Sequence, residues 1–295
     1  MPEIFGIPLP AILSQLLLGF VNGAFYAMLS LGLAVIFGLL NVINFAHGAL
    51  FMLGAVLAWM GMQYAGLSYW VMLLLAPLIV AAIGVAIERS MLRWIYKLDH
   101  IYGLLLTLGI TLVIEGIFRS AYGVSGLPYS TPDLLTGATD IGFMILPNYR
   151  AWVVGASISV CLATWFVIER TKLGAYLRAG TENPKIVESF GVNVPRMITL
   201  TYACGVGLAA LAGVLAAPVV QVSPLMGQNL IIVVFAVVVI GGMGSILGSI
   251  VTGLGLGVVE GITKVIYPEA SSTVVFFIMV IVLLLRPAGL FGRDK

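Results

Sequence analysis

Uncharged apolar runs of about 20 residues, repeated along the whole chain, limit its possible folds more than any other feature. No charged residue occurs from Phe5 to Ile87, where Glu88 and Arg89 follow. The chain is 61% hydrophobic and only 9% charged, whereas soluble domains have roughly 25% charged residues. Most of its surface must therefore face lipid.

The apolar runs are expected to be helices, because backbone amides cannot stay unpaired in hydrocarbon. The sequence predicts an all-α membrane protein, a single polytopic domain over 1–295 with about eight to nine transmembrane helices. The segments around 41–48 and 241–248 read either as tight turns or as helix breaks or re-entrant segments. The predicted spans are 12–39, 46–64, 69–87, 101–118, 151–168, 197–217, 229–246, 248–265 and 272–286.

Basic residues gather in alternate connecting segments, which predicts the orientation. The segments 88–100 and 169–196 and the C-terminus are basic, whereas 120–149 and 265–271 contain no Lys or Arg. With the basic segments in the cytoplasm, nine crossings place the N-terminus outside and the C-terminus in the cytoplasm. The loop at 119–150, rich in Pro, Gly, Ser and Thr, is then external and ordered by turns.

The sequence has none of the common catalytic or ligand-binding motifs. It lacks H-E-x-x-H, G-x-S-x-G and a G-x-x-x-x-G-K-[ST] phosphate loop. No carboxylate cluster accompanies His47 and His100 to hold a metal, and no basic stripe indicates nucleic-acid binding. Cys161 and Cys204 lie in apolar runs and read as small buried hydrophobes. We expect no cofactor on this chain, and any ATP hydrolysis must come from another chain.

Two carboxylates inside predicted spans are followed by basic residues four positions later. Glu115 precedes Arg119 and Glu260 precedes Lys264, in the favourable order for a helical pair. Both pairs lie near predicted outer helix ends, so they read as interfacial ion pairs. This interpretation leaves no clear buried proton carrier.

A polar segment interrupts the apolar pattern between the first two predicted spans. Asn41, Asn44 and His47 lie there among apolar residues, and burying such groups unpaired costs a few kcal/mol each. One interpretation is a cytoplasmic turn in which an Asn caps the next helix. The other is a helix break that lines a translocation path.

Glycines gather between residues 240 and 261. Gly253, Gly257 and Gly261 recur every four residues and predict a smooth helix face for close backbone packing. Gly244 and Gly248, in the turn-like part of the segment, are assigned to the same packing role.

The segment 174–197 is far more polar than its surroundings. Its pattern predicts a short helix from about Asn183 to Phe190, with Thr181 as its cap, Pro184 in its first turn and Gly191 after its end. A short helix along the cytoplasmic face is a natural contact for a soluble partner.

Four segments, in order along the chain, resemble the shorter of two permease types in branched-chain amino acid ABC transporters. They are GLLNVINFAHGALFMLGA (38–55), RAGTENPKIVESFGVNVPRM (178–197), VIGGMGSILGSIVTGLGLGVVE (239–260) and the ending LRPAGLFGR (285–293). The resemblance extends from about residue 11 to 293.

The resemblance implies a set of partners. They are a homologous second permease subunit, two cytoplasmic ATP-binding subunits, and a periplasmic substrate-binding protein, with lipid around the helices. The segment 178–197 would hold the coupling helix, with Glu182 and Gly191 matching its motif. Candidate residues are, for ATPase coupling, Arg178, Glu182, Asn183, Glu188 and Gly191, and for the substrate path, Asn41, Asn44 and His47.

Two other functional classes stay open. A self-sufficient secondary transporter or channel would need buried ionisable residues or a filter motif, and an intramembrane enzyme would need a nucleophile, base or metal. The resemblance favours import of branched-chain or other neutral amino acids, although related systems carry amides or urea.

Overall fold

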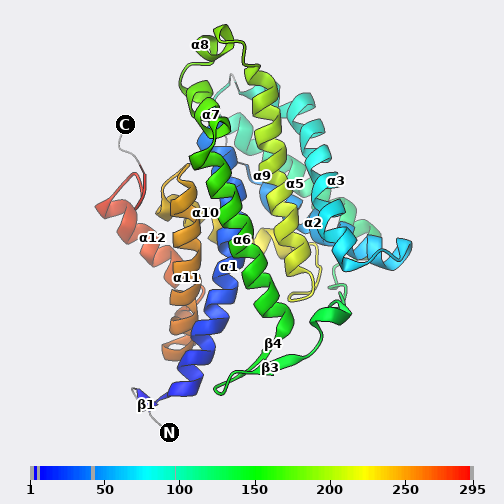
Figure 1. Ribbon diagram of the computed structural model, residues 1–295, viewed down its shortest axis with the longest axis vertical. Helices are drawn as coiled ribbons and strands as arrows, with labels where there is room; N and C mark the ends of the chain where they lie inside the picture. The colour runs from blue at the N-terminus through cyan, green and yellow to red at the C-terminus, as the bar shows by residue number, and fades with distance from the viewer. Residues whose placement is uncertain (1–2, 5–6, 41–43, 97, 293–295) are drawn as a thin grey trace. The chain divides into compact units, whose positions relative to one another are not determined.

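The computed structural model describes residues 3–4, 7–40, 44–96 and 98–292, and its regular structure is mainly helical (Figure 1). The helices are α1 (Leu9–Leu40), α2 (Ala46–Ala65), α3 (Tyr69–Ile87), α4 (Arg93–Ile95), α5 (His100–Tyr122), α6 (Asn148–Arg170), α7 (Lys172–Glu182), α8 (Pro184–Ser189), α9 (Val194–Ala216), α10 (Met226–Gly241), α11 (Ile246–Ile266) and α12 (Val274–Leu285). The strands are β1 (Glu3–Ile4), β2 (Ile7–Pro8), β3 (Ala138–Asp140) and β4 (Ile145–Pro147), in two antiparallel pairs.

Seven helical segments in the described part of the chain are long and apolar enough to cross a membrane. This confirms the prediction of an all-α polytopic membrane protein. The predicted spans at 229–246 and 272–286 are too long, because α10 has 16 residues and α12 has 12. At 1.5 Å per residue these helices are about 24 and 18 Å long, against roughly 30 Å of hydrocarbon.

Contacts divide the chain into two compact units. Unit 1 contains residues 1–30, 131–161 and 233–295, and unit 2 contains residues 31–130 and 162–232. The helices α1, α6 and α10 each contribute residues to both units.

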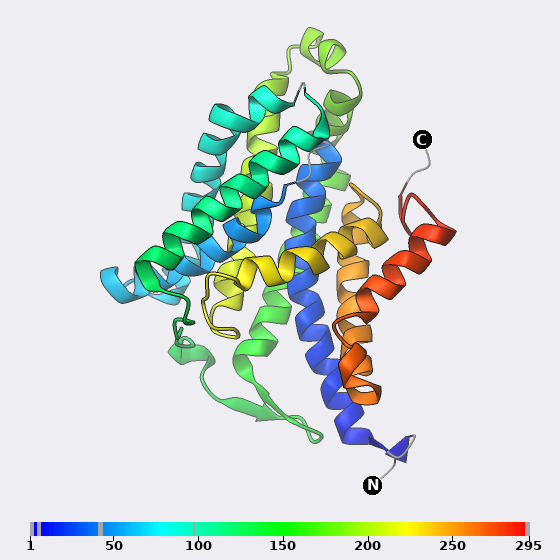
Figure 2. The same cartoon turned by 180° about the vertical axis from the view of Figure 1, so that it is seen from behind.

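In unit 2, α2, α3 and α9 pack together and α5 lies against α2 (Figure 2). Backbones come close where side chains are small: a Cβ on Gly54 would collide with Ala210, and one on Gly213 with Phe51. Small residues allow such approach between membrane helices. The surrounding core contains Ile36, Ala46, Leu50, Val80, Leu92, Tyr202, Val206 and Ala210.

In unit 1, a tight turn joins α10 to α11. Gly242 and Gly244 have φ angles of 101° and 84°, which end the helix at Gly241. The Ser245 side chain then caps α11 by accepting a hydrogen bond from the Gly248 backbone at 3.1 Å. The segment 241–248 is therefore a turn between two helices, and not a break within one.

The C-terminal segment of unit 1 closes the end of α10. The backbone N–H groups of Leu290 and Phe291 donate to the carbonyls of Ile240 and Gly241, at 2.8 and 3.1 Å. These bonds satisfy carbonyls that a helix end leaves without partners. Two segments that carry the family resemblance, 239–260 and 285–293, thus meet in the fold.

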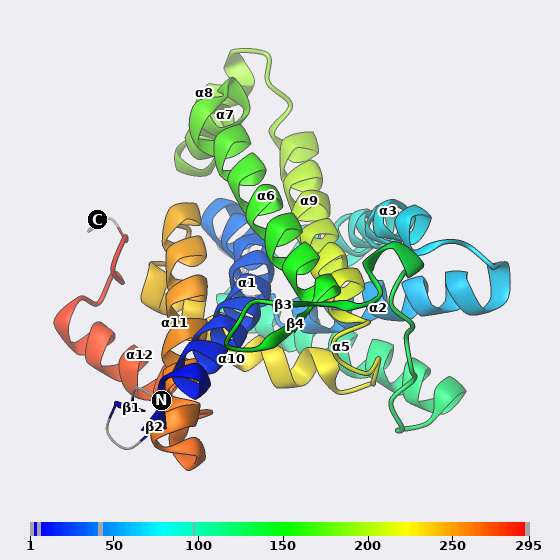
Figure 3. The same cartoon turned by 60° about the horizontal axis from the view of Figure 1, so that its bottom comes forward.

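Between α5 and α6 the chain forms a 3-10 turn (Asp133–Leu135) and the β3–β4 hairpin, as its turn-rich composition predicts (Figure 3). The hairpin register pairs Ala138 with Pro147 and Asp140 with Ile145. This hairpin leads directly into α6.

The sequence predicts that the third span ends at 87, but the structure continues the helix. A π-helical turn (Glu88–Leu92) joins α3 to α4, so the continuous helical segment is Tyr69–Ile95. Charged residues do not stop a helix that extends beyond the hydrocarbon, because the headgroup region accommodates them.

Candidate functional site

The α7–α8 hairpin of unit 2 contains the residues predicted for coupling. The Asn183 side chain caps α8 by accepting a hydrogen bond from the Ile186 backbone at 3.2 Å, with Pro184 at the first helical position. The predicted cap, Thr181, lies instead within α7. Gly191 follows α8 with a φ of 83°, a left-handed conformation that side chains disfavour.

Arg178 connects α7 to the end of α6. Its Nη1 donates to the carbonyl oxygen of Ile168 at 3.1 Å and lies 3.6 Å from Oε2 of Glu169. The carbonyl belongs to the last turn of α6, where a cation is favoured by the helix dipole. These contacts of Arg178 therefore hold α7 against the end of α6.

The outer surface of α8 presents apolar side chains to solvent. Phe190 is 81% exposed and Ile186 54% exposed, whereas Val187 packs inward. Glu182 and Glu188 are also exposed. An exposed aromatic residue beside charged residues is typical of a protein contact surface.

The structure describes two of the three candidate path residues. Asn41 lies outside the described residues. Asn44 and His47 are fully buried within unit 2. The Asn44 Nδ2 atom donates to the Tyr202 hydroxyl at 3.2 Å, and a Cβ on Gly32 would contact the His47 ring. In this conformation both side chains pack between helices, and neither is exposed to solvent.

A buried carboxylate that the sequence pattern assigns to a loop lies close to this region. Glu88 is 1% exposed and its Oε2 accepts a hydrogen bond from the Thr199 hydroxyl of α9 at 2.7 Å. Burial, together with the Glu88 carboxylate, raises the pKa of Tyr96, so this hydroxyl stays protonated. Glu88 begins the π-helical turn, and such turns often occur at functional positions. No sequence motif indicates the burial of Glu88.

The recurring glycines of α11 lie against α1 within unit 1. A Cβ on Gly257 would collide with Gly23 and Gly19, and one on Gly261 with Gln15. Gly253 faces Ala27 in the same way. Gly19, Gly23 and Ala27 repeat the four-residue spacing on α1, so two small-residue faces meet. Gly248, at the start of α11, is in close backbone contact with Gly241 of α10, whereas Gly244 lies in the turn between these helices.

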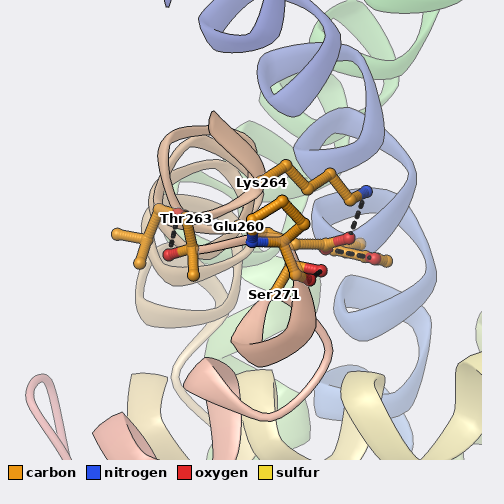
Figure 4. Close-up of polar contacts among 7 residues, drawn as sticks. Glu260, Thr263, Lys264 and Ser271 are labelled. Atoms are coloured by element: carbon orange, nitrogen blue, oxygen red, sulfur yellow. Dashed lines mark hydrogen bonds and ion pairs between the residues drawn. The ribbon is translucent and has the colours of Figure 1, made fainter. Parts of the chain in front are cut away.

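An ion pair on α11 lies beside the α1–α11 contact (Figure 4). The Lys264 Nζ is 2.7 Å from Oε1 of Glu260, and the Tyr26 hydroxyl donates to Oε2 of Glu260 at 2.7 Å. The predicted pair is therefore present, with a tyrosine in addition.

The prediction of an ion pair between Glu115 and Arg119 is wrong. Among the described residues no ion pair joins Glu115 to Arg119, and Oε1 of the buried Glu115 has no hydrogen-bond partner there.

A large groove of unit 2 is apolar. It has a volume of about 850 Å³ and lies between α2, α3 and α5, with lining residues that include Met52, Met60, Ile87 and Ile114. A zwitterionic amino acid would lose its hydration there without gaining hydrogen bonds. This groove suits hydrocarbon and does not form an amino-acid path.

Comparison with known proteins decides the family. A model described as the permease component of the branched-chain amino acid transport system matches residues 15–284. The chain belongs to this permease family. This confirms the resemblance drawn from the four segments and the prediction of a permease in place of an enzyme.

Named relatives extend over nearly the whole permease. It is 29% identical to the high-affinity branched-chain amino acid permease LivH of Salmonella typhimurium, over 96% of each chain. It is 28% identical to BraD of Pseudomonas aeruginosa, over 100% of this chain and 99% of the relative. Its identity to LivM of Escherichia coli is 28%, over 92% of this permease and 68% of that protein.

Membership of the permease family shows which structural features are relevant to function. Transport permeases need a scaffold that holds helices together and a surface that receives a driving force. In this permease, the α1–α11 contact joins two helices closely, and the α7–α8 hairpin presents exposed side chains. The permease is a multi-pass membrane protein, and no metal-binding group of His, Cys, Asp or Glu occurs among its described residues.

Proposed function

We propose that this permease is one half of the membrane pore of an ATP-driven importer for branched-chain or other neutral amino acids. The observation that carries the proposal is the match to the permease family over residues 15–284. Relatives named for high-affinity branched-chain amino acid transport support the substrate class. Similarity to both LivH and LivM supports pairing with a homologous second permease.

Two ATP-binding subunits are proposed to bind the pair of permeases, one of them at the α7–α8 hairpin of this chain. Phe190 and Ile186 offer an exposed apolar contact, and Arg178, Glu182, Asn183, Glu188 and Gly191 shape or surround it. ATP is used by these partners, and the permease itself needs no cofactor. A periplasmic binding protein supplies substrate from the other side, so the permease does not need a tight amino-acid site.

The proposed orientation places the N-terminus outside and the C-terminus in the cytoplasm of a bacterial inner membrane. The basic segments at 88–100 and 169–196 support it. Seven long helices can cross the membrane, and two shorter apolar helices accompany them. The number of crossings is nine if both short helices cross and seven if neither does, and both numbers are odd. Either case leaves the termini on opposite sides.

Reconstitution into vesicles tests the proposal. Uptake of radiolabelled leucine should require the second permease, the ATP-binding subunits, the binding protein and ATP together. Uptake by this chain alone, without ATP, would show a self-sufficient transporter.

The buried Glu88 gives the secondary-transporter alternative a specific basis, because an ionisable residue within a membrane protein is a candidate proton carrier. We expect Glu88→Gln to keep ATP-driven uptake within about threefold, since the amide still accepts the Thr199 hydrogen bond. Uptake that follows an imposed pH gradient and disappears in Glu88→Gln would favour proton coupling instead.

A further inference from the structure

Three arginines converge on a small pocket where the α3–α4 segment meets the start of α9. The pocket has a volume of about 270 Å³, and its lining residues are Arg89, Arg93, Asn193, Pro195, Arg196 and Thr199. The helices α3 and α9 lie side by side within unit 2 (Figure 1). Space for about nine water molecules, at some 30 Å³ each, accommodates a phosphate group with part of its hydration shell.

The pocket has a surplus of positive charge. In the part of the chain that the structure describes, no carboxylate forms an ion pair with any of the three guanidinium groups. The acidic neighbour, Glu88, is buried behind Thr199 and accepts that residue's hydroxyl hydrogen bond. The positive end of the α9 dipole adds to the surplus. Like charges gathered without a counterion repel one another, so the pocket favours an anion.

The height of the pocket in the membrane follows from helix length. The segment Tyr69–Ile95 has 27 residues and is about 40 Å long, roughly 10 Å more than the hydrocarbon thickness. Arg89 and Arg93 lie in this excess. Trp94 beside them is 76% exposed, and tryptophan is enriched at the membrane interface. The pocket is therefore at the level of the lipid headgroups.

An apolar groove extends along α9 from Met197, next to Arg196, to Leu211. Leu200 follows Arg196 by four residues and is 64% exposed. With Pro77, Cys204 and Leu211 it lines a groove of about 450 Å³ in the same unit. A phosphate at Arg196 would thus have hydrocarbon-lined space below it, which suits a lipid better than a free ion.

We propose that this pocket binds the phosphate group of an anionic phospholipid, with an acyl chain along the groove at Leu200. Guanidinium groups bind phosphate oxygens through paired, charge-assisted hydrogen bonds. The site goes beyond the proposed transport function and does not depend on which solute the permease carries. With the proposed orientation, the lipid belongs to the cytoplasmic leaflet.

Native mass spectrometry of the purified full chain tests the site. Wild type in detergent is titrated with phosphatidylglycerol, phosphatidylcholine or inorganic phosphate. We expect retained phosphatidylglycerol that phosphatidylcholine does not replace. Arg89→Gln/Arg93→Gln should bind phosphatidylglycerol about fivefold more weakly for each arginine removed. Arg170→Gln/Lys172→Gln removes the same charge outside the pocket and should bind as wild type does.

Equal binding by wild type and the pocket variant would overturn the proposal, as would an equal loss in the control variant. Displacement of the lipid by millimolar phosphate would show a solution-anion site and overturn the lipid assignment. Arg89→Lys/Arg93→Lys keeps the charge but loses the paired geometry, so it should bind with intermediate strength. Because this variant preserves the net charge, it decides the question if the glutamine variant fails to fold.

Discussion

Gly257 and Gly191 serve two regions of this permease in different ways. At Gly257, in the α1–α11 contact, a Cβ would collide with the α1 backbone. At Gly191, after the exposed helix α8, a Cβ would meet nothing within 4 Å, but the φ angle is 83°. The first glycine is needed for its small size and the second for its conformation. We expect the α1–α11 contact to be lost when a side chain is added at its glycines. The proposed docking element should instead lose its function when its backbone conformation or its exposed side chain changes.

The largest expected effect is that of Gly257→Leu. The added side chain must separate α1 from α11, which we expect to cost about 3 kcal/mol. The variant is heated to a series of temperatures and then examined by size-exclusion chromatography. It should lose its folded, monodisperse fraction at a lower temperature than the wild type. Gly255→Leu is the matched control, because nothing lies within 4 Å of its Cβ position. Equal stability of the two variants would mean that the α1–α11 contact does not hold unit 1 together.

Phe190→Ala should have the next largest effect, on coupling and not on folding. Loss of a central aromatic contact costs roughly 2 kcal/mol, so ATP-driven uptake should fall about 30-fold at limiting ATP-binding subunit. Leu134→Ala is the control, since Leu134 is also 81% exposed but lies in the 119–150 loop. Normal uptake by Phe190→Ala would remove α8 from the docking surface.

Gly191→Ala should reduce uptake through backbone conformation alone. The left-handed conformation costs a non-glycine residue roughly 1–2 kcal/mol, which predicts a loss of about fivefold to 30-fold. Gly191→Asn should recover most of the uptake, because asparagine tolerates this conformation. If alanine and asparagine behave alike in the vesicle assay, the φ angle is not the reason for a glycine here.

The smallest effect is expected at the Glu260 cluster. Tyr26→Phe removes one hydrogen bond to the carboxylate and should lower the free energy of unfolding by about 1 kcal/mol. Lys264→Met should have a similar or smaller effect, because Lys264 is 38% exposed and surface ion pairs contribute little. Comparing the unfolding midpoint of each variant with that of Gly257→Leu shows whether polar contacts or glycine packing contribute more to stability. A larger loss in Tyr26→Phe than in Gly257→Leu would reverse this ranking.

The apolar runs predicted the main helices because hydrocarbon requires continuous hydrogen-bonded backbone. The pattern of the polar segment 174–197 predicted α8 and its glycine end, since Pro184 and Gly191 act locally. Asn183 rather than Thr181 caps α8, because α7 continues to Glu182, and one residue of helix length decides which side chain is free to cap.

Contacts between residues far apart in the sequence could not be predicted from local sequence patterns. Glu88 follows a predicted span and reads as a loop residue, and its burial depends on Thr199, 111 positions away. The bonds from Leu290 and Phe291 to the end of α10 also join distant segments. Among the candidate path residues, burial of Asn44 depends on Tyr202, which no local pattern indicates. Which residues bring ATPase subunits to the permease stays a prediction.

Site-specific crosslinking tests that prediction most directly. A photoreactive amino acid at position 190, in the assembled importer, should crosslink to the ATP-binding subunit, whereas one at position 134 should not. ATP should change the yield at position 190, since docking is proposed to transmit nucleotide-driven movement. An intact complex with no crosslink from position 190, or with equal crosslinks from 134, would contradict the assignment of α7–α8 as the docking element.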